Sequence, residues 1–124
     1  MTDWRSLCRG GTDLVVDTDV VTVAVGDGRT QRVRVKATAS TYELSSIVVR
    51  AAALDEIDDA PLRAWRRNRT SQLVGFRIDE RGGLVAVGWV PTVGLTGEEF
   101  AGLVRRVAAA ADLFEYQLTG KDRE

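Results

Sequence analysis

A one-sided helical pattern fills the last quarter of the chain and restricts the folds that the chain can adopt. Thr96-Gly97-Glu98-Glu99 is a capping box, in which Thr96 begins a helix and Glu99 reaches back to it. Gly120 is typical of a helix end. Between them, apolar residues recur at intervals of three and four: Phe100, Leu103, Val104, Val107, Ala108, Ala111, Phe114 and Leu118. Because such a helix is stabilised mainly by packing of its apolar face, the rest of the chain has to supply a second layer.

Alternating patterns upstream predict that this second layer is a β-sheet. Residues 20–25 are rich in valine, and residues 32–37 alternate apolar with basic side chains. Gly26-Asp27-Gly28-Arg29 between them is typical of a hairpin turn. The basic face of the second strand indicates an antiparallel sheet with one face in water.

Three further strands complete the expected sheet. Residues 42–52 predict a third strand, and residues 73–79 and 84–90 predict a hairpin around Gly82-Gly83. Residues 13–16 have the composition of a short strand start, and we do not count them among these five strands. In the last strand we expect Val85, Val87 and Trp89 to face the core.

Two shorter helices are expected besides the last one. Residues 2–9 carry Trp4 and Leu7 at helical spacing and end at Gly10-Gly11. A second helix starts near Pro61, with Leu62 and Trp65 expected to face inward and its arginines outward. The sequence therefore predicts one α+β domain over residues 1–124. Its two layers are a five-stranded antiparallel sheet and helices on one face, in the order short helix, three strands, helix, two strands, long helix.

Composition argues against an enzyme. The chain has no histidine and one cysteine, Cys8, so it lacks an imidazole base, a serine triad and the usual zinc ligands. The acidic residues 55–59 lack the spacing of a calcium loop. We expect no catalytic residue, no metal site and no cofactor.

Charge and hydropathy give further expectations. The net charge is −1, which predicts no general attraction to nucleic acid or to anionic membranes. The sequence shows no secretory leader and no long apolar span, so we expect a cytoplasmic protein without membrane contact. An arginine cluster at Arg63, Arg66, Arg67 and Arg69 leaves nucleic-acid binding open as an alternative.

The second half of the chain resembles the YbjN family and the related type III secretion chaperones of the CesT kind. The residues that carry the resemblance are Asn68, Gly75-Phe76-Arg77-Ile78-Asp79, Gly82-Gly83, Val90-Pro91, Leu95 to Phe100, Val107-Ala108 and Ala111-Asp112. The resemblance implies a compact domain with a strongly twisted antiparallel sheet, usually paired into a homodimer. It also implies that an extended segment of a client polypeptide is held against apolar patches of the dimer.

Together these features predict a non-enzymatic, chaperone-like, protein-binding module. We expect it to hold an extended segment of a partner polypeptide on apolar grooves of a homodimer. Trp4, Leu7, Leu62 and Trp65 are the expected contributors to partner or dimer contact. Two alternatives stay open: a dimeric structural or regulatory module with no client, and nucleic-acid binding through the helix from Arg63 to Arg69. The sequence does not identify the client.

Overall fold

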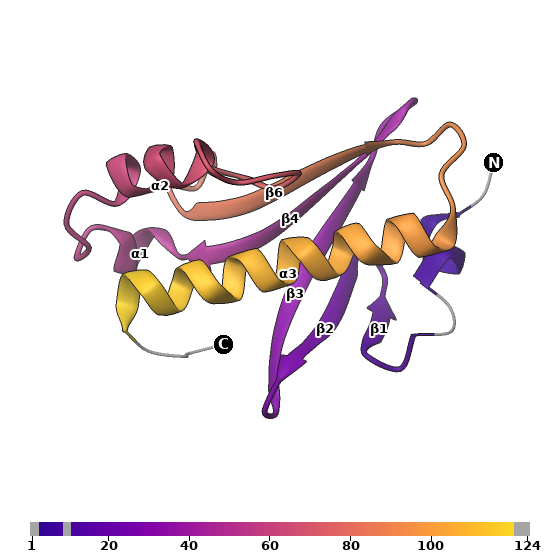
Figure 1. Ribbon diagram of the computed structural model, residues 1–124, viewed down its shortest axis with the longest axis horizontal. Helices are drawn as coiled ribbons and strands as arrows, with labels where there is room; N and C mark the ends of the chain where they lie inside the picture. The colour runs from indigo at the N-terminus through magenta and orange to yellow at the C-terminus, as the bar shows by residue number, and fades with distance from the viewer. Residues whose placement is uncertain (1–2, 9–10, 121–124) are drawn as a thin grey trace.

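One long helix crosses a face of a six-stranded, twisted antiparallel sheet in the computed structural model, which describes residues 3–8 and 11–120 (Figure 1). The sheet order is β1-β2-β3-β4-β6-β5, and every neighbouring pair is antiparallel. The strands are β1 (Leu14–Asp17), β2 (Val20–Gly26), β3 (Arg29–Ala37), β4 (Thr41–Val49), β5 (Gly75–Ile78) and β6 (Leu84–Pro91). The helical segments are η1 (Trp4–Cys8), α1 (Ala51–Leu54), α2 (Ala60–Asn68) and α3 (Gly97–Thr119). The predicted α+β class is confirmed.

The predicted number of strands is wrong, because residues 14–17 form a sixth strand. β1 pairs with β2 from Leu14 opposite Val23 to Asp17 opposite Val20. The turn between the two strands is Thr18-Asp19, with Thr18 in the left-handed region at φ 51°. Such a turn contains no glycine, so the usual sequence signal for a hairpin is missing.

Two other segments also differ from their predictions. The strand predicted over residues 42–52 stops at Val49, and the alanine-rich residues that follow form the short helix α1. The segment predicted as an α-helix near the N-terminus is the 3-10 helix η1. The expected helix ends at residues 2 and 9 lie outside the described residues.

Helix α3 has the boundaries that its capping box predicts. The Thr96 hydroxyl accepts a hydrogen bond from the Glu99 backbone N–H at 3.1 Å, and the Glu99 carboxylate accepts one from the Thr96 N–H at 3.0 Å. Gly120 ends the helix in the left-handed region at φ 68°. The apolar stripe along the helix is buried against β2, β3, β4 and β6.

The helix packs on the face of β6 that carries its small residues. Leu84 and Ala86 are fully buried, and a Cβ placed on Gly88 would lie 3.0 Å from Val107 Cγ2. The opposite face carries Trp89, which is 68% exposed. The prediction that Trp89 faces the core is therefore wrong. Both faces of β6 are apolar, and the close approach of α3 selects the face with glycine and alanine.

A buried polar network joins the C-terminal half of α3 to the sheet. Gln31 donates to Glu115 at 3.3 Å and accepts from the Ser46 hydroxyl at 3.1 Å. Arg29 forms an ion pair with Asp112 at 3.1 Å. These contacts fix the lateral position of α3, because polar groups inside a core have to meet partners.

Candidate partner-binding surfaces

The first predicted binding residue, Trp4, is part of the core in this structure. It is 5% exposed, and its ring centroid lies 6.1 Å from that of Phe100. Phe100 in turn makes an edge-to-face contact with Tyr42 at 5.4 Å. Leu7, on the same short helix, is partly buried against the core. Trp4 is therefore covered as long as η1 keeps this position.

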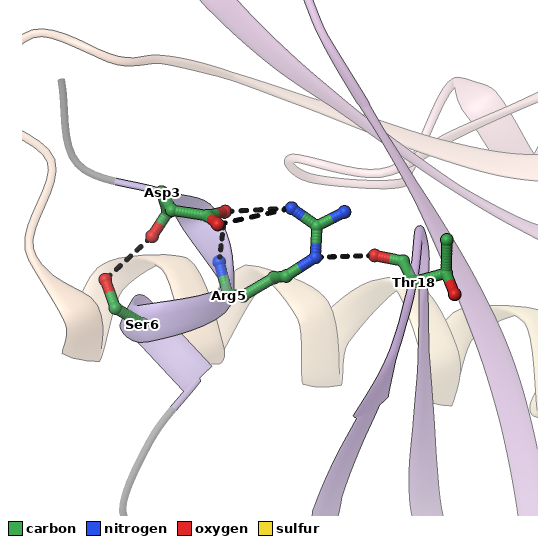
Figure 2. Close-up of polar contacts among 4 residues, drawn as sticks. All are labelled: Asp3, Arg5, Ser6 and Thr18. Atoms are coloured by element: carbon green, nitrogen blue, oxygen red, sulfur yellow. Dashed lines mark hydrogen bonds and ion pairs between the residues drawn. The ribbon is translucent and has the colours of Figure 1, made fainter.

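A small set of exposed polar contacts holds η1 in place (Figure 2). Arg5 Nε donates to the backbone oxygen of Thr18 at 2.7 Å, which ties η1 to the turn between β1 and β2. Arg5 also pairs with Asp3 at 3.0 Å, and the Ser6 hydroxyl donates to the Asp3 backbone oxygen at 2.7 Å. The bond to Thr18 connects this segment to the sheet.

Two open clefts flank η1. The first, of about 360 Å³, is lined by apolar atoms of Trp4, Val35, Ala37 and Tyr42 together with polar groups that include Arg5. The second, of about 520 Å³, lies on the other side against the start of α3, and its lining includes Leu7, Cys8, Ala101 and Arg105. Both clefts are open to solvent and carry apolar as well as charged side chains.

Cys8, in the second cleft, is poorly suited to be a nucleophile. Burial raises the pKa of its thiol, and the charge of Arg105 opposes this effect only in part. A raised pKa leaves little thiolate at neutral pH. Within the part of the chain that the structure describes, no three His, Cys, Asp or Glu side chains are grouped so that they could hold a metal ion.

The other two predicted residues, Leu62 and Trp65, lie on the outer face of α2. The prediction that they point inward is wrong: Ala60 and Ala64 are buried, whereas Trp65 is 57% exposed. The guanidinium of Arg69 lies over the Trp65 ring at 5.3 Å. The small alanine side chains allow α2 to pack closely, so they occupy the inner face and the larger residues face outward.

The four predicted residues do not form one site. Trp4 and Leu7 lie at the N-terminal end of α3, where Gly97 approaches the Leu7 backbone. Leu62 and Trp65 lie on α2, which contacts the far end of α3 through a hydrogen bond from Arg63 to the Gln117 backbone oxygen at 3.0 Å. Figure 1 shows η1 and α2 at opposite ends of α3.

Half of the arginine cluster is used inside the domain. Besides the bond made by Arg63, Arg67 donates to the Gln117 side chain and lies over the rings of Phe76 and Phe114 at 5.7 and 4.8 Å. Burial lowers the pKa of Arg67. The four arginines therefore do not form a row of side chains that are all available to contact phosphate groups.

An apolar patch that was not predicted from the sequence lies on the helix-free face of the sheet. Trp89 and Ile47 are exposed there, with the partly buried Val87 on the strand next to β4. Trp89 Nε1 donates to Glu43 at 3.2 Å, and Arg77 pairs with the same carboxylate at 3.1 Å. The small residues Ala86 and Gly88 on the other side of β6 were the available signal for this orientation.

The two edges of the sheet differ. At β5, the Asn68 side chain occupies both backbone groups of Phe76, donating to its oxygen at 2.9 Å and accepting from its N–H at 2.7 Å. At β1, the bond from the Ala24 N–H to the Asp13 oxygen shows that Asp13 faces β2. Alternation along an antiparallel ladder then directs the backbone groups of Leu14 and Val16 toward the open edge.

Comparison with known proteins supports the fold assignment. No protein-family model matches the chain, and no curated protein matches it by sequence. A chain in the crystal structure of the ExsC–ExsE complex is 18% identical with a TM-score of 0.61, over 93% of this chain and 92% of that chain. A chain in the crystal structure of the Yersinia pestis type III secretion chaperone SycH with a stable fragment of YscM2 is 9% identical with a TM-score of 0.56. That match covers 94% of this chain and all of the other.

These likenesses establish a shared fold. The fold implied by the resemblance to type III secretion chaperones is confirmed, whereas the resemblance to the YbjN family stays a prediction. Among the described residues, no helix has both the length and the hydropathy needed to span a membrane.

Proposed function

We propose that this protein is a non-enzymatic, chaperone-like, cytoplasmic module that binds an extended segment of a partner polypeptide as a homodimer. The main support is exposed apolar surface on a small domain: Trp65 and Trp89 are 57% and 68% exposed. Tryptophan is enriched at protein–protein interfaces relative to the rest of the protein surface. The fold adds support, since the SycH structure contains a chaperone in complex with a polypeptide fragment.

We assign the outer face of α2 to the dimer contact. Leu62 and Trp65 are 43% and 57% exposed there. A two-fold symmetric contact would place the same face of two copies together, so the Trp65 side chain of each copy would be covered by α2 of the other copy. Aromatic residues at the centre of an interface carry much of the binding energy.

We assign the helix-free face and the β1 edge to the partner segment. Ile47, Val87 and Trp89 offer apolar contacts across two neighbouring strands. The outward backbone groups of Leu14 and Val16 offer hydrogen bonds to an added strand. Side-chain contacts of this kind give specificity, and main-chain bonds add affinity for any extended segment.

The dimer can be tested by sedimentation equilibrium. We expect the wild-type protein to be dimeric at micromolar concentration and Trp65→Ala to shift it toward the monomer without loss of helical circular dichroism. Val93→Ala is the matched control, because Val93 is an 88% exposed apolar residue outside α2. A wild-type monomer throughout the micromolar range would contradict the homodimer. A dimer that survives Trp65→Ala would place the contact elsewhere.

The partner can be tested by quantitative capture from native lysate, comparing wild type, Trp89→Ala and Val93→Ala. Loss of an interface tryptophan commonly costs more than about 1 kcal/mol, or about fivefold in affinity. We expect a captured polypeptide that Val93→Ala retains and Trp89→Ala loses. If all three proteins capture the same set equally, the helix-free face is not the binding surface.

The two alternatives predict other outcomes. A structural module with no client predicts the dimer and no captured polypeptide. Nucleic-acid binding through α2 predicts an affinity that falls steeply with salt. That alternative is weakened because Arg63 and Arg67 are bonded to Gln117.

A further inference from the structure

The helix-free face of the sheet carries a row of basic side chains beside its apolar patch. Along β3 the buried valines face α3, so the alternating residues Arg32, Arg34 and Lys36 face the other way. All three side chains are exposed. This basic row therefore shares one surface with Trp89 and its apolar neighbours on β4 and β6.

The register of the sheet sets the distance between the basic row and the apolar patch. Arg34 lies opposite Ser45 of β4, and Ser45 lies opposite Val87 of β6, so these three side chains form one line across the face. Because neighbouring strands are about 4.8 Å apart, the basic row on β3 and the apolar residues on β6 are about 10 Å apart. An extended polypeptide that runs along β4 would direct successive side chains to opposite sides, one toward β3 and the next toward β6.

Few acidic groups neutralise the basic row. Within the described parts of the chain, Arg34 has one ion pair, a contact of 3.9 Å with the exposed Asp19, and neither Arg32 nor Lys36 has one. Asp17 lies two strands away on β1. The whole protein has a net charge of −1, so the positive charge of this row is a local feature of one surface.

The carboxylate on β4 is engaged beside the apolar patch. Glu43 accepts a hydrogen bond from Trp89 Nε1 at 3.2 Å and pairs with Arg77 at 3.1 Å. Its charge is therefore offset from the β5 side of the face and not by the basic row. The same bond holds the polar edge of the indole toward β4.

We propose that the polypeptide segment bound on the helix-free face is acidic as well as apolar, with carboxylates directed to the basic row and alternating apolar side chains directed to Ile47, Val87 and Trp89. This inference rests on the proposed function, because it states the chemistry of the partner at the surface assigned to it. The apolar patch supplies contact area, and the basic row selects among apolar segments by their charge. A segment with lysine or arginine at the alternating positions is repelled.

The same face is less suited to single-stranded nucleic acid. Among the residues of the described strands, Trp89 is the one exposed aromatic side chain, whereas proteins that bind single strands stack successive bases on aromatic rings. The Glu43 carboxylate lies against this ring, where it would repel the phosphate groups of a stacked nucleotide. An acidic peptide can place an uncharged side chain at that position.

Fluorescence anisotropy with labelled synthetic peptides tests the charge preference. Each peptide has about ten residues, the length of a long strand, and alternates valine or leucine with one kind of polar residue. That residue is aspartate in the first peptide, asparagine in the second and lysine in the third. We expect full-length wild-type protein to bind the aspartate peptide at least about fivefold more tightly than the asparagine peptide, and the lysine peptide most weakly. The difference should shrink as salt is added, because the charges are exposed.

Paired variants connect this preference to the basic row. Arg32→Gln combined with Lys36→Gln should weaken binding of the aspartate peptide about three- to tenfold and leave binding of the asparagine peptide nearly unchanged. The matched control combines Arg81→Gln with Arg106→Gln, which removes the same charge from exposed positions in the β5–β6 turn and on α3. Trp89→Ala should weaken binding of both peptides. Circular dichroism checks that every variant is folded.

Several results would overturn the inference. Equal affinity for the aspartate and asparagine peptides, or no binding of either, would show that this face does not select acidic segments. An equal loss in the control variant would show an effect of net charge alone. Tighter binding of a single-stranded oligonucleotide, lost with Arg32 and Lys36, would assign the basic row to nucleic acid. A polypeptide captured from lysate through Trp89, without any preference for the aspartate peptide, would leave the proposed function in place and remove this inference.

Discussion

At the scale of single residues, Asp112 and Arg29 form a largely buried ion pair between α3 and the sheet. Asp112 is 9% exposed, and one of its two carboxylate oxygens is buried without a hydrogen-bond partner within the described structure. An ion pair of this kind is costly to disrupt, because removal of one member leaves the other charge in a poorly solvated position.

Asp112→Ala should therefore destabilise the protein by about 2–3 kcal/mol, somewhat less than a fully buried pair because the Arg29 side chain retains 30% exposure. The measurement is urea unfolding followed by circular dichroism. Asp19→Ala is the control, since the pair of Asp19 with Arg34 is exposed and 3.9 Å long. Its loss should change the free energy of unfolding by less than about 0.5 kcal/mol. Equal effects of the two changes would contradict this account of the pair.

The orientation of single tryptophans could not be predicted from the sequence. Both strand faces around Trp89 are apolar or small, so periodicity did not define the inner face there, whereas in α2 the placement of the arginines outward put Leu62 and Trp65 inward, which is wrong. In both cases alanine or glycine occupies the inner face, because close packing of two backbones requires small side chains. Trp4 was predicted to contact a partner or a second copy, whereas it is buried in the core, and its burial depends on the long-range contact with Phe100.

At the scale of elements, the crossing of α3 over β6 depends on Gly88. A Cβ at this position would lie 3.0 Å from Val107 Cγ2 and 3.2 Å from Leu103 Cδ1. Both distances are shorter than ordinary van der Waals contact, so helix and strand would have to separate.

Gly88→Ala should destabilise the domain by about 1–3 kcal/mol through this overpacking. Val107→Ala alone should also destabilise it, because it leaves a cavity in a fully buried position. The double variant should be more stable than the sum of the two single effects predicts, since the new methyl group enters the space vacated by valine. Thermal unfolding of the four proteins in a double-mutant cycle measures this coupling. Strictly additive effects would show that the two positions are not in contact.

Elements with local signals were predicted well. Helix α3 was correct at both ends, because a capping box and a left-handed glycine are set by neighbouring residues. The hairpin between β2 and β3 was also correct, with Asp27 and Gly28 at positive φ. β1 was expected only as a short stretch of strand and was not counted in the sheet, and α1 was missed. A glycine-free turn and a four-residue helix carry little information of their own and depend on the sheet beside them.

At the scale of the whole molecule, an ion pair connects the first strand region with the last helix. Arg105 on α3 donates to Asp13 at 2.7 and 3.0 Å, although the two residues are far apart in sequence. The hydrogen bond from Arg105 lowers the pKa of the Asp13 carboxyl group. The same contact raises the pKa of Arg105.

This contact should make stability depend on pH in the acid range. A carboxyl group whose pKa is lower in the folded state stabilises the fold above its unfolded pKa of about 3.9, and this contribution is lost as pH falls through the folded pKa. Arg105→Ala should reduce the loss of stability between about pH 5 and pH 3. Because the two side chains are 43% and 36% exposed, the effect should stay below about 1 kcal/mol.

Urea unfolding at several pH values measures this difference. Arg34→Ala is a suitable control, because its longer pair with Asp19 lies elsewhere on the surface. If Arg105→Ala left the pH dependence unchanged, the Asp13 contact would have no role in it.

The arrangement of the whole molecule limited what the sequence could say about the site. The two-layer order of helices and strands followed from periodicity, but the positions of η1 and α2 at opposite ends of α3 did not. The four residues expected to act together are divided between these two positions. In the packed structure Trp4 is buried in the core, whereas Trp65 lies on the exposed face of α2.

The amide of Asn68 also limits how copies of this protein can polymerise. It closes the ladder at the centre of β5, whereas the backbone groups of Leu14 and Val16 in β1 are directed away from β2. Growth by backbone pairing is consequently one-sided. If two molecules paired through their β1 strands, the outer edges of the joined sheet would both be β5 strands. Because Asn68 occupies the backbone groups at the centre of β5, further strand addition and fibril growth would stop at the dimer.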